Sequence, residues 1–411
     1  MRKRDLLMFD KLNKTIGNNI YFALFYLFIS LCFTSILKEI PFINLLSKLA
    51  LVWGVLLAFY NIIKIIKRKP NLIELSIFIF LGYTLLANLL IYRSSGNLKV
   101  WIVNLILFMG LFFIDNDKDK KELIKDIGIF SYSISIFTFI FSLAANITYF
   151  GKISFTLKDT VYGLNQGLYI YKNALAIASG IGIIVTLYLI MKKQNLSIKA
   201  KLFFRINILL QVLSLIFSKG RSGYFLIIAV PFVLIFMKYK NKIFRRCMII
   251  IPAILCIGGF AAFHEKLYTF LSARNELWYS AWLLIKKHPV LGVGNSDLVE
   301  KVYSMRPGVI LPGIEAGGLH NIFLQITTAN GFIGLVLFLF VLSTSLTFLV
   351  KKIDFSFAKQ RKINLVGLSL IVGIIFVNLF EADLIYIVSF IPIIFWTYLG
   401  YFISILKDSE L

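Results

Sequence analysis

Charged residues are scarce in this chain of 411 residues. Together Lys, Arg, Asp and Glu account for 16% of the sequence, whereas 59% of the residues are hydrophobic and the mean hydropathy is +0.84. An average soluble domain carries about 25% charged residues, which cover its surface. The scarcity of charge excludes a soluble protein and predicts an integral membrane protein.

Acidic residues are scarcer than basic ones, 20 against 44, so the net charge is +24. Such an excess can indicate nucleic acid binding, but here the lysines and arginines lie between apolar runs rather than on one basic face. We interpret them as topology signals, and we expect no nucleic acid partner.

Cysteine and histidine are rare as well, with three residues of each. Cys32, Cys247 and Cys256 all lie inside apolar runs, where we interpret them as small packing residues. They form no CxxC pair and no spacing typical of a disulfide framework or a metal site. The sequence therefore gives no sign of a bound metal.

Apolar runs long enough to cross a bilayer recur along the whole chain. A helix needs about 20 residues for the crossing, and it satisfies its own backbone hydrogen bonds in lipid. We therefore predict an all-α fold with about twelve transmembrane helices. The expected ranges are 20–37, 43–63, 72–92, 100–114, 127–149, 173–191, 205–217, 222–237, 247–263, 321–350, 363–380 and 384–406.

The basic residues also predict an orientation. With both termini in the cytoplasm, the inner segments hold 29 of the 44 basic residues, although the outer side has the longest loop. If the assignment of segments to the inner and outer sides were shifted by one span, most of these basic residues would lie on the outer side. The first residues, MRKRDLLMFDKLNK, lack a small-residue cleavage site after the first apolar stretch, so we expect a retained cytoplasmic end.

Polar residues collect in the loop between the ninth and tenth spans. The expected layout is nine helices in 1–263, an outer loop in 264–320 and three helices in 321–411. The loop holds all three histidines, and a loop of this length in a compact protein is usually functional. In contrast, most spans carry no ionisable residue near their middle, which argues against a coupled transporter.

Within the loop, RNELWYSAWLLIKK predicts a helix at the membrane surface. Leu277, Trp278, Ala281, Trp282 and Ile285 recur at helical spacing and form an aromatic and apolar side. Charged residues occupy the other side, so we expect an interfacial helix.

Two more motifs place polar side chains at the ends of apolar runs. The SKGRSG turn holds Arg221 near the membrane surface, where an arginine needs an anionic partner. His320 and Asn321 directly precede the tenth span, and Asn321 is suited to cap that helix or to orient the imidazole ring. Simpler roles stay open, because Arg221 could reach a lipid phosphate and His320 could bind phosphate.

Three segments, in this order, resemble the O-antigen ligase and polymerase family of bacterial surface polysaccharide assembly. They are SKGRSG, RNELWYSAWLLIKKHPVLGVGN and LHNIFLQITTANGFIGL, and they span about 130 residues. The resemblance implies a multi-span glycosyltransferase of GT-C-like (class B) architecture that takes glycan from undecaprenyl diphosphate on the outer face. It implies no metal or other cofactor, and a multi-pass location in the bacterial cytoplasmic membrane.

Carried over by motif, the resemblance assigns catalytic roles to Arg221, Arg274 and His320. Family members often have serine directly before the turn arginine, whereas this chain has Gly220. The further residues expected to contact substrate are Lys219, Asn173, Asn321, Trp278 and His288.

The chemistry suits these residue types. Breaking a sugar C1–diphosphate bond releases an anion, and guanidinium groups such as those of Arg221 and Arg274 bind phosphate with paired, charge-assisted hydrogen bonds. The acceptor hydroxyl must lose a proton, and an imidazole with an ordinary pKa near 6.5 can take it. We expect His320 to be that base.

Several functions fit this chemistry. We favour a polysaccharide polymerase that joins lipid-linked repeat units for capsule, exopolysaccharide or O-antigen. A ligase would use the same donor with a core acceptor. An alternative of another class is a lipid-linked oligosaccharide flippase, which favours a charged cavity and repeated halves that are not evident here. The expected partners are the undecaprenyl-diphosphate-linked oligosaccharide and the bilayer, with a chain-length regulator left open.

Carboxylates stay open as alternative bases, and Glu381 and Asp383, in the last outer turn, either face the same site or end a helix. The loop candidates are Glu265, Glu276, Asp297, Glu300 and Glu315.

Overall fold

The computed structural model describes residues 17–192, 196–262, 274–311 and 317–407. The predicted N-terminal end, the boundary at 263/264, and His264, Glu265 and Glu315 lie outside these ranges. The helices and strands in chain order are α2 (Asn19–Phe33), η1 (Ile36–Glu39), α3 (Ile43–Arg68), α4 (Leu72–Ala87), η2 (Asn88–Tyr92), α5 (Ser95–Leu105), η3 (Ile106–Leu111), α6 (Lys120–Phe150), β1 (Ser154–Leu157), β2 (Thr160–Gly163), α7 (Lys172–Lys192), α8 (Ile198–Ser218), α9 (Tyr224–Lys238), α10 (Lys242–Ala262), α12 (Arg274–Lys287), α13 (Leu298–Tyr303), α14 (Ile322–Asp354), α15 (Ala358–Val377) and α16 (Phe390–Lys407).

The helices are those of a membrane protein. In the described ranges, eight are long and apolar enough to cross a bilayer, namely α3, α4 with η2, α6, α7, α8, α14, α15 and α16. Three shorter apolar helices, α2, α5 with η3, and α9, fall in other expected ranges, and α10 occupies the ninth. The predicted class is confirmed: the chain is an all-α, multi-pass integral membrane protein. In its described part, the one sheet is the antiparallel β1–β2 hairpin.

Short polar residues cap the starts of several of these helices. The side chains of Asn18, Asn71, Asp119 and Ser197 each accept a hydrogen bond from a backbone N–H of the first turn of the helix that follows. Such caps satisfy donors that have no partner within the helix. The apolar runs thus set the helix lengths, and the caps set where several of the helices begin.

The α7 and α16 helices form the centre of the bundle. In their most apolar 18-residue windows, 83% and 94% of the residues are buried. Small residues allow neighbouring helices to approach α7 closely, since a Cβ on Gly182 would lie 2.9 Å from Thr138 Oγ1. Polar side chains in this region bond to one another, as where the Ser142 hydroxyl donates to Gln211 at 2.6 Å. Buried polar groups in lipid require such partners.

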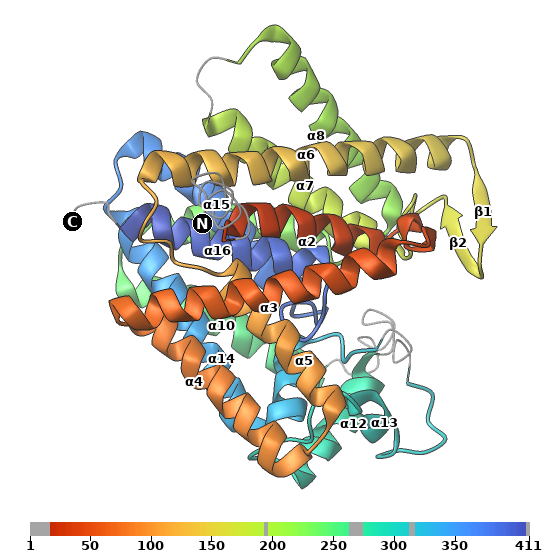
Figure 1. Cartoon of the computed structure of the whole chain (residues 1–411). Helices are drawn as coiled ribbons and strands as arrows, with labels where there is room; N and C mark the ends of the chain where they lie inside the picture. The colour runs from red at the N-terminus through yellow and green to blue at the C-terminus, as the bar shows by residue number, and fades with distance from the viewer. Residues whose placement is uncertain (1–16, 193–195, 263–273, 312–316, 408–411) are drawn as a thin grey trace, which may run out of the picture.

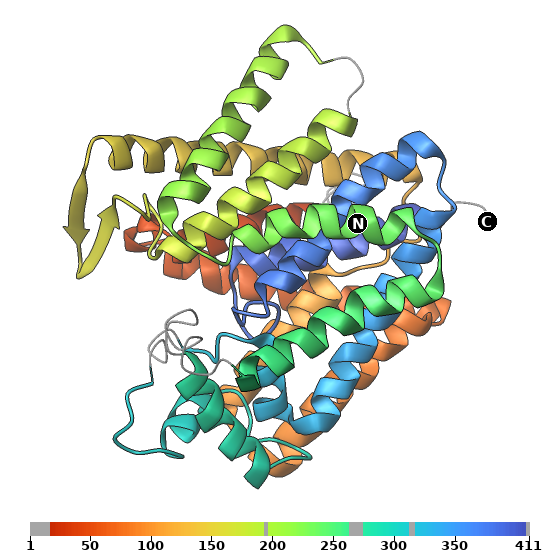
Figure 2. The ribbon, with the colours of Figure 1, turned by 180° about the vertical axis from the view of Figure 1, so that it is seen from behind.

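The bundle has two different ends. Figure 1 shows the β1–β2 hairpin and the α12–α13 segment on the same side of the molecule, and the reversed view in Figure 2 agrees. We call this end the loop side. The opposite end, the lysine side, carries the turn after α3, the α9–α10 turn, the α14–α15 turn and the end of α16. There Arg245 pairs with Asp354 at 2.6 Å, and Lys64 with Asp117 at 2.7 Å.

Within the predicted outer loop, α12 covers the range expected for the interfacial helix. Its side chains Leu277, Ala281 and Leu284 pack with residues of α13 and of the segments before α14 in a separate small core. Trp282, expected on the same apolar side, is 43% exposed. The buried face of α12 therefore packs mainly on the protein itself, which fixes the helix against α14.

The last span was expected to begin at residue 384, but α16 begins at Phe390. Hydrogen bonds to side chains hold the preceding residues in an irregular path. Asn104 accepts from the backbone N–H of Tyr386 at 2.7 Å, and Trp396 donates to the carbonyl of Leu384 at 2.8 Å. Tyr386 has a positive φ of 73°, which ends regular structure. Residues 378–389 thus form a loop that is longer than apolar periodicity indicates, and we call it the 378–389 loop.

A break divides α14 near its loop-side end. Gly331 has φ 67° and ψ −175°, a conformation essentially restricted to glycine. The carbonyls freed by the break accept other donors: Tyr83 donates to Asn330 at 2.8 Å, and the Gly294 N–H to Ala329 at 2.8 Å. The glycine-containing segment after Pro289 therefore supplies hydrogen-bond donors to carbonyls that the break in the helix leaves without intrahelical partners.

We expect Gly331→Ala to destabilise the protein by at least ~2 kcal/mol, because alanine is strained at this φ and its Cβ would overlap the Val290 carbonyl oxygen. Thermal unfolding of the purified protein in detergent measures this. Gly82→Ala is the matched control, since a Cβ there meets nothing within 4 Å. Equal unfolding temperatures of the two variants would contradict the assigned role of the break.

Candidate functional site

One buried carboxylate joins several segments on the loop side. Glu381, in the 378–389 loop, is only 6% exposed. Its Oε1 accepts hydrogen bonds from Ser222 at 2.6 Å and from Asn173 at 2.9 Å, and lies 3.5 Å from a guanidinium nitrogen of Arg274. Its Oε2 lies 3.0 Å from Nδ1 of His320. We call these five residues the Glu381 cluster.

Backbone hydrogen bonds hold the 378–389 loop against the start of α14. The Ile322 N–H donates to the Asn378 carbonyl at 3.0 Å. Asn321 caps α14 by accepting from the Leu324 N–H at 2.9 Å, and its amide donates to the Leu379 carbonyl at 3.0 Å. Because Asn321 connects the helix end to the loop, His320 is brought beside Glu381.

The turn that carries His320 is held on several sides. His320 has a positive φ of 49°, which costs a non-glycine residue about 1–3 kcal/mol. The preceding residue compensates, because the Leu319 N–H donates to Gln325 at 3.1 Å and its carbonyl accepts from the Trp278 indole at 2.8 Å. The imidazole therefore has a defined position, with its side chain 15% exposed.

Arg274 begins α12 and points toward the same loop. Its guanidinium donates to the Phe380 carbonyl and pairs with Glu381. A guanidinium has five N–H groups in a fixed plane, so these contacts orient it without using all its donors. The side chain is 17% exposed, which leaves part of it accessible at the site.

Glycines let the SKGRSG turn approach α7. A Cβ on Gly220 would lie 2.6 Å from the Cβ of Ala176, and one on Gly223 would overlap the Ala176 carbonyl. This close contact places the Ser222 hydroxyl and the Asn173 amide on the same carboxylate oxygen. The glycine that departs from the family's serine is therefore required by packing in this chain.

The pKa values of two carboxyl groups in the 378–389 loop are shifted in opposite directions. Burial alone would raise the pKa of Glu381, but the hydrogen bond with His320 and the charge of Arg274 outweigh it, so this pKa lies below its usual range. Burial, and then the nearby charge of Glu381, raise the pKa of Asp383 to about 7. Glu381 is thus held as a carboxylate, while Asp383 keeps a proton more readily.

The structure brings together three of the eight residues selected from the sequence, His320, Arg274 and Asn173. Arg221 is exposed, but it directly precedes Ser222 of the cluster. Trp278 and Asn321 hold the His320 turn and the helix start. The remaining two, Lys219, which ends α8, and His288, which follows the far end of α12, are exposed and are not part of the cluster.

The sequence motifs assign no specific role to Glu381, the residue that joins the cluster. They predict only that Glu381 and Asp383 face the site or end a helix. The signal was an acidic pair, EAD, between two apolar runs on the side that already held the other polar motifs. Within the described ranges, no group of three His, Cys, Asp or Glu residues is placed to hold a metal ion.

Comparison with known proteins agrees with the resemblance seen in the motifs. Residues 206–339 match the model of a family described as O-antigen ligase. An uncharacterized protein of Haemophilus influenzae is 26% identical over 221 residues, a match that covers 47% of this chain and 54% of that protein. The chain thus matches about half the length of this relative. The family match includes Arg221, Arg274 and His320, and it ends before Glu381.

We expect Asp383→Asn to flatten the pH dependence of stability between about pH 4 and pH 7. Between its ordinary pKa of 3.8 and about 7, the folded protein keeps a proton on Asp383 that the unfolded chain has released. Stability of the unmodified protein therefore falls as pH rises through this window, and the variant loses that contribution. Thermal unfolding at several pH values measures it, with the exposed Asp297→Asn as control. Parallel curves for all three proteins would refute the assignment.

Proposed function

We propose that this membrane protein, whose residues 206–339 match the O-antigen ligase family, is a polysaccharide polymerase that joins undecaprenyl-diphosphate-linked oligosaccharide repeat units. The observation that supports this most is the Glu381 cluster. In it a histidine, an arginine and a buried carboxylate from separate segments meet at the loop-side end of the bundle. The lipid diphosphate and an aqueous acceptor would meet at this depth.

His320 is proposed as the base that activates the acceptor. An ionised Glu381 accepts a hydrogen bond from Nδ1–H, which leaves the lone pair on Nε2. As the acceptor hydroxyl oxygen bonds to the donor sugar's C1, its proton passes to Nε2. The carboxylate stabilises the imidazolium that results.

Arg274 is proposed to bind the leaving diphosphate. When the C1–oxygen bond breaks, the electron pair stays with the phosphate oxygen, and a guanidinium stabilises this charge through charge-assisted hydrogen bonds. Arg221, next to Ser222, is proposed to reach the same diphosphate from the turn between α8 and α9. No metal is assigned to the step, since two guanidinium groups supply the positive charge.

We also propose the orientation. The lysine side faces the cytoplasm and holds both termini, because basic residues concentrate on the inner side of membrane proteins. The loop side then faces outward in the bacterial cytoplasmic membrane, where the lipid-linked glycan is presented. Cysteine labelling with an impermeant reagent would test this: a single cysteine at exposed Lys287 should react in intact cells, and one at exposed Lys240 should not.

A ligase that moves glycan from the same carrier to a core acceptor is the second candidate, because the matching family is described as O-antigen ligase. Surface glycan from a deletion strain separates the two. Loss of a polymerase leaves single repeat units, whereas loss of a ligase leaves long chains that are not attached to their acceptor.

We expect His320→Ala to reduce glycan transfer by about 10²–10⁴-fold, the usual contribution of a general base. Arg274→Lys should also reduce transfer strongly, since lysine cannot make the paired contact with phosphate. Transfer is measured with purified protein and a lipid-linked donor, with protein level checked in parallel.

Arg306→Lys is the matched control for the arginine variant. It lies on the loop side and pairs with Glu276 at 2.7 Å, away from the Glu381 cluster. It should retain most of the transfer activity. Normal transfer by His320→Ala at a normal protein level would be incompatible with the proposal.

A further inference from the structure

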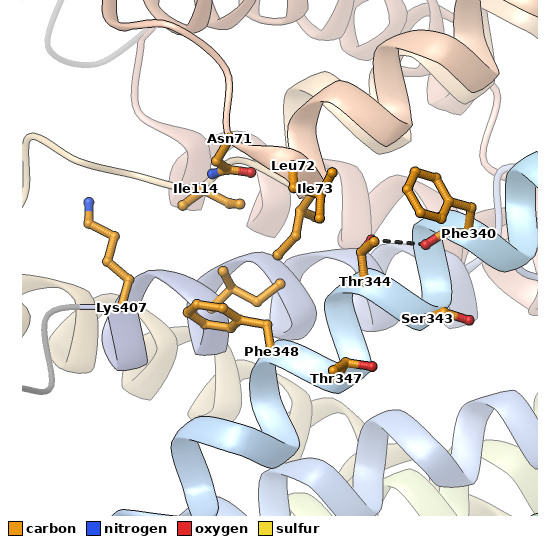
Figure 3. A pocket seen from close by; sticks show the side chains of 11 residues that line it. Asn71, Leu72, Ile73, Ile114, Phe340, Ser343, Thr344, Thr347, Phe348 and Lys407 are labelled. Atoms are coloured by element: carbon orange, nitrogen blue, oxygen red, sulfur yellow. Dashed lines mark hydrogen bonds between the residues drawn. The ribbon is translucent and has the colours of Figure 1, made fainter. Parts of the chain in front are cut away.

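A groove at the opposite end of the protein has no part in the Glu381 cluster. It has a volume of about 540 Å³, within the range of about 300–1,000 Å³ typical of ligand sites. Figure 3 shows its walls, which come from the start of α4, the C-terminal half of α14 and the end of α16. We call it the lysine-side groove. Its lining residues include Leu72, Ile73, Ile114, Phe340, Phe348 and Ile403.

The groove is mostly apolar, and α14 hydroxyls and the Lys407 ammonium group add polar atoms to its lining. Ser343, Thr344 and Thr347 contribute hydroxyls to the α14 wall. Lys351, the next residue along this face, is exposed. With a rise of about 1.5 Å per residue, Thr347 and Ser343 lie roughly 6 Å and 12 Å from the level of Lys351. The groove thus offers an apolar surface for an acyl chain and lysines at its lysine-side end for a phosphate.

A second, smaller cavity of about 280 Å³ lies beside the groove and is basic. Three basic residues and one acidic residue line it, together with Phe113 and Asn116: Lys64, Lys67, Arg68 and Asp117. Lys407 connects the two spaces, since it lines the groove and its ammonium group donates to the Asn116 side chain. The apolar groove and the smaller cavity therefore meet at Lys407.

Some of these cations are already neutralised. Arg68 pairs with Glu74, and Lys64 with Asp117. Lys407 donates to the Asp115 carbonyl at 3.3 Å rather than to a carboxylate. Across the described ranges, no carboxylate forms an ion pair with Lys67 or Lys407. Among the described residues, Lys407 in the groove lining and Lys67 in the neighbouring cavity thus form no ion pair with a carboxylate.

We propose that the lysine-side groove is a binding site for an anionic phospholipid of the adjacent leaflet. One acyl chain lies between α4 and α14, and the phosphate binds Lys67 and Lys407. Leu72 and Phe340, which are 60% and 40% exposed, form the lateral entrance through which the chain enters from the bilayer. The charge favours an anionic headgroup over a zwitterionic one, since each lysine near an anionic headgroup contributes attraction. This site is independent of the proposed glycan transfer.

The test uses native mass spectrometry of the detergent-purified protein, titrated with phosphatidylglycerol or with phosphatidylcholine of the same acyl chains. We expect Lys67→Gln with Lys407→Gln to weaken phosphatidylglycerol binding by roughly ten- to thirtyfold, and to leave phosphatidylcholine binding nearly unchanged. Lys199→Gln with Lys201→Gln is the matched control, because it removes two charges from exposed positions at the start of α8.

A second measurement locates the acyl chain. Phosphatidylglycerol with a photoreactive acyl chain should label the α14 segment 340–348 in the unmodified protein, and Thr344→Trp should abolish this label by filling the groove. Equal affinity for the two lipids would overturn the proposal. So would equal weakening by both charge variants, or labelling that lies outside the groove walls.

Discussion

The loop-side end depends on keeping one carboxylate ionised out of water. A buried charge is costly unless partners compensate it, and Glu381 has four: a hydroxyl, an amide, a guanidinium and an imidazole. These partners come from the α8–α9 turn, α7, α12 and the turn before α14, which are far apart in the sequence. Losing any one partner would leave the cost of burying this charge less compensated. The carboxylate therefore favours the single arrangement of the four segments in which all four partners contact it.

Much of the fold follows from apolar length and from short polar caps. The twelve expected ranges each contain a helix, since a helix in lipid is the only way for an isolated segment to satisfy its backbone. The start of α16 could not be predicted this way, because residues 384–389 are as apolar as a span. What prevents a helix there is a set of distant donors and acceptors, such as Asn104 and Trp396, that no local pattern reveals.

The sequence likewise predicts only part of the candidate site. His320 and Arg274 lie in local motifs, so the sequence identified them, and the structure joins them through Glu381. Glu381 itself lies 61 residues after His320 and belongs to no motif. Helical spacing likewise identifies the apolar side of α12, but the neighbouring elements decide which part of that side packs on the protein, and Trp282 is 43% exposed.

The break at Gly331 gives α14 two mechanically separate pieces. The short piece, 322–330, carries the cap at Asn321 and is fastened through its carbonyls to tyrosine hydroxyls and to the segment after Pro289. The long piece, 332–354, faces α4 and lipid. Since no continuous run of intrahelical hydrogen bonds connects them, tilting of the long rod as the bilayer changes thickness need not displace the imidazole.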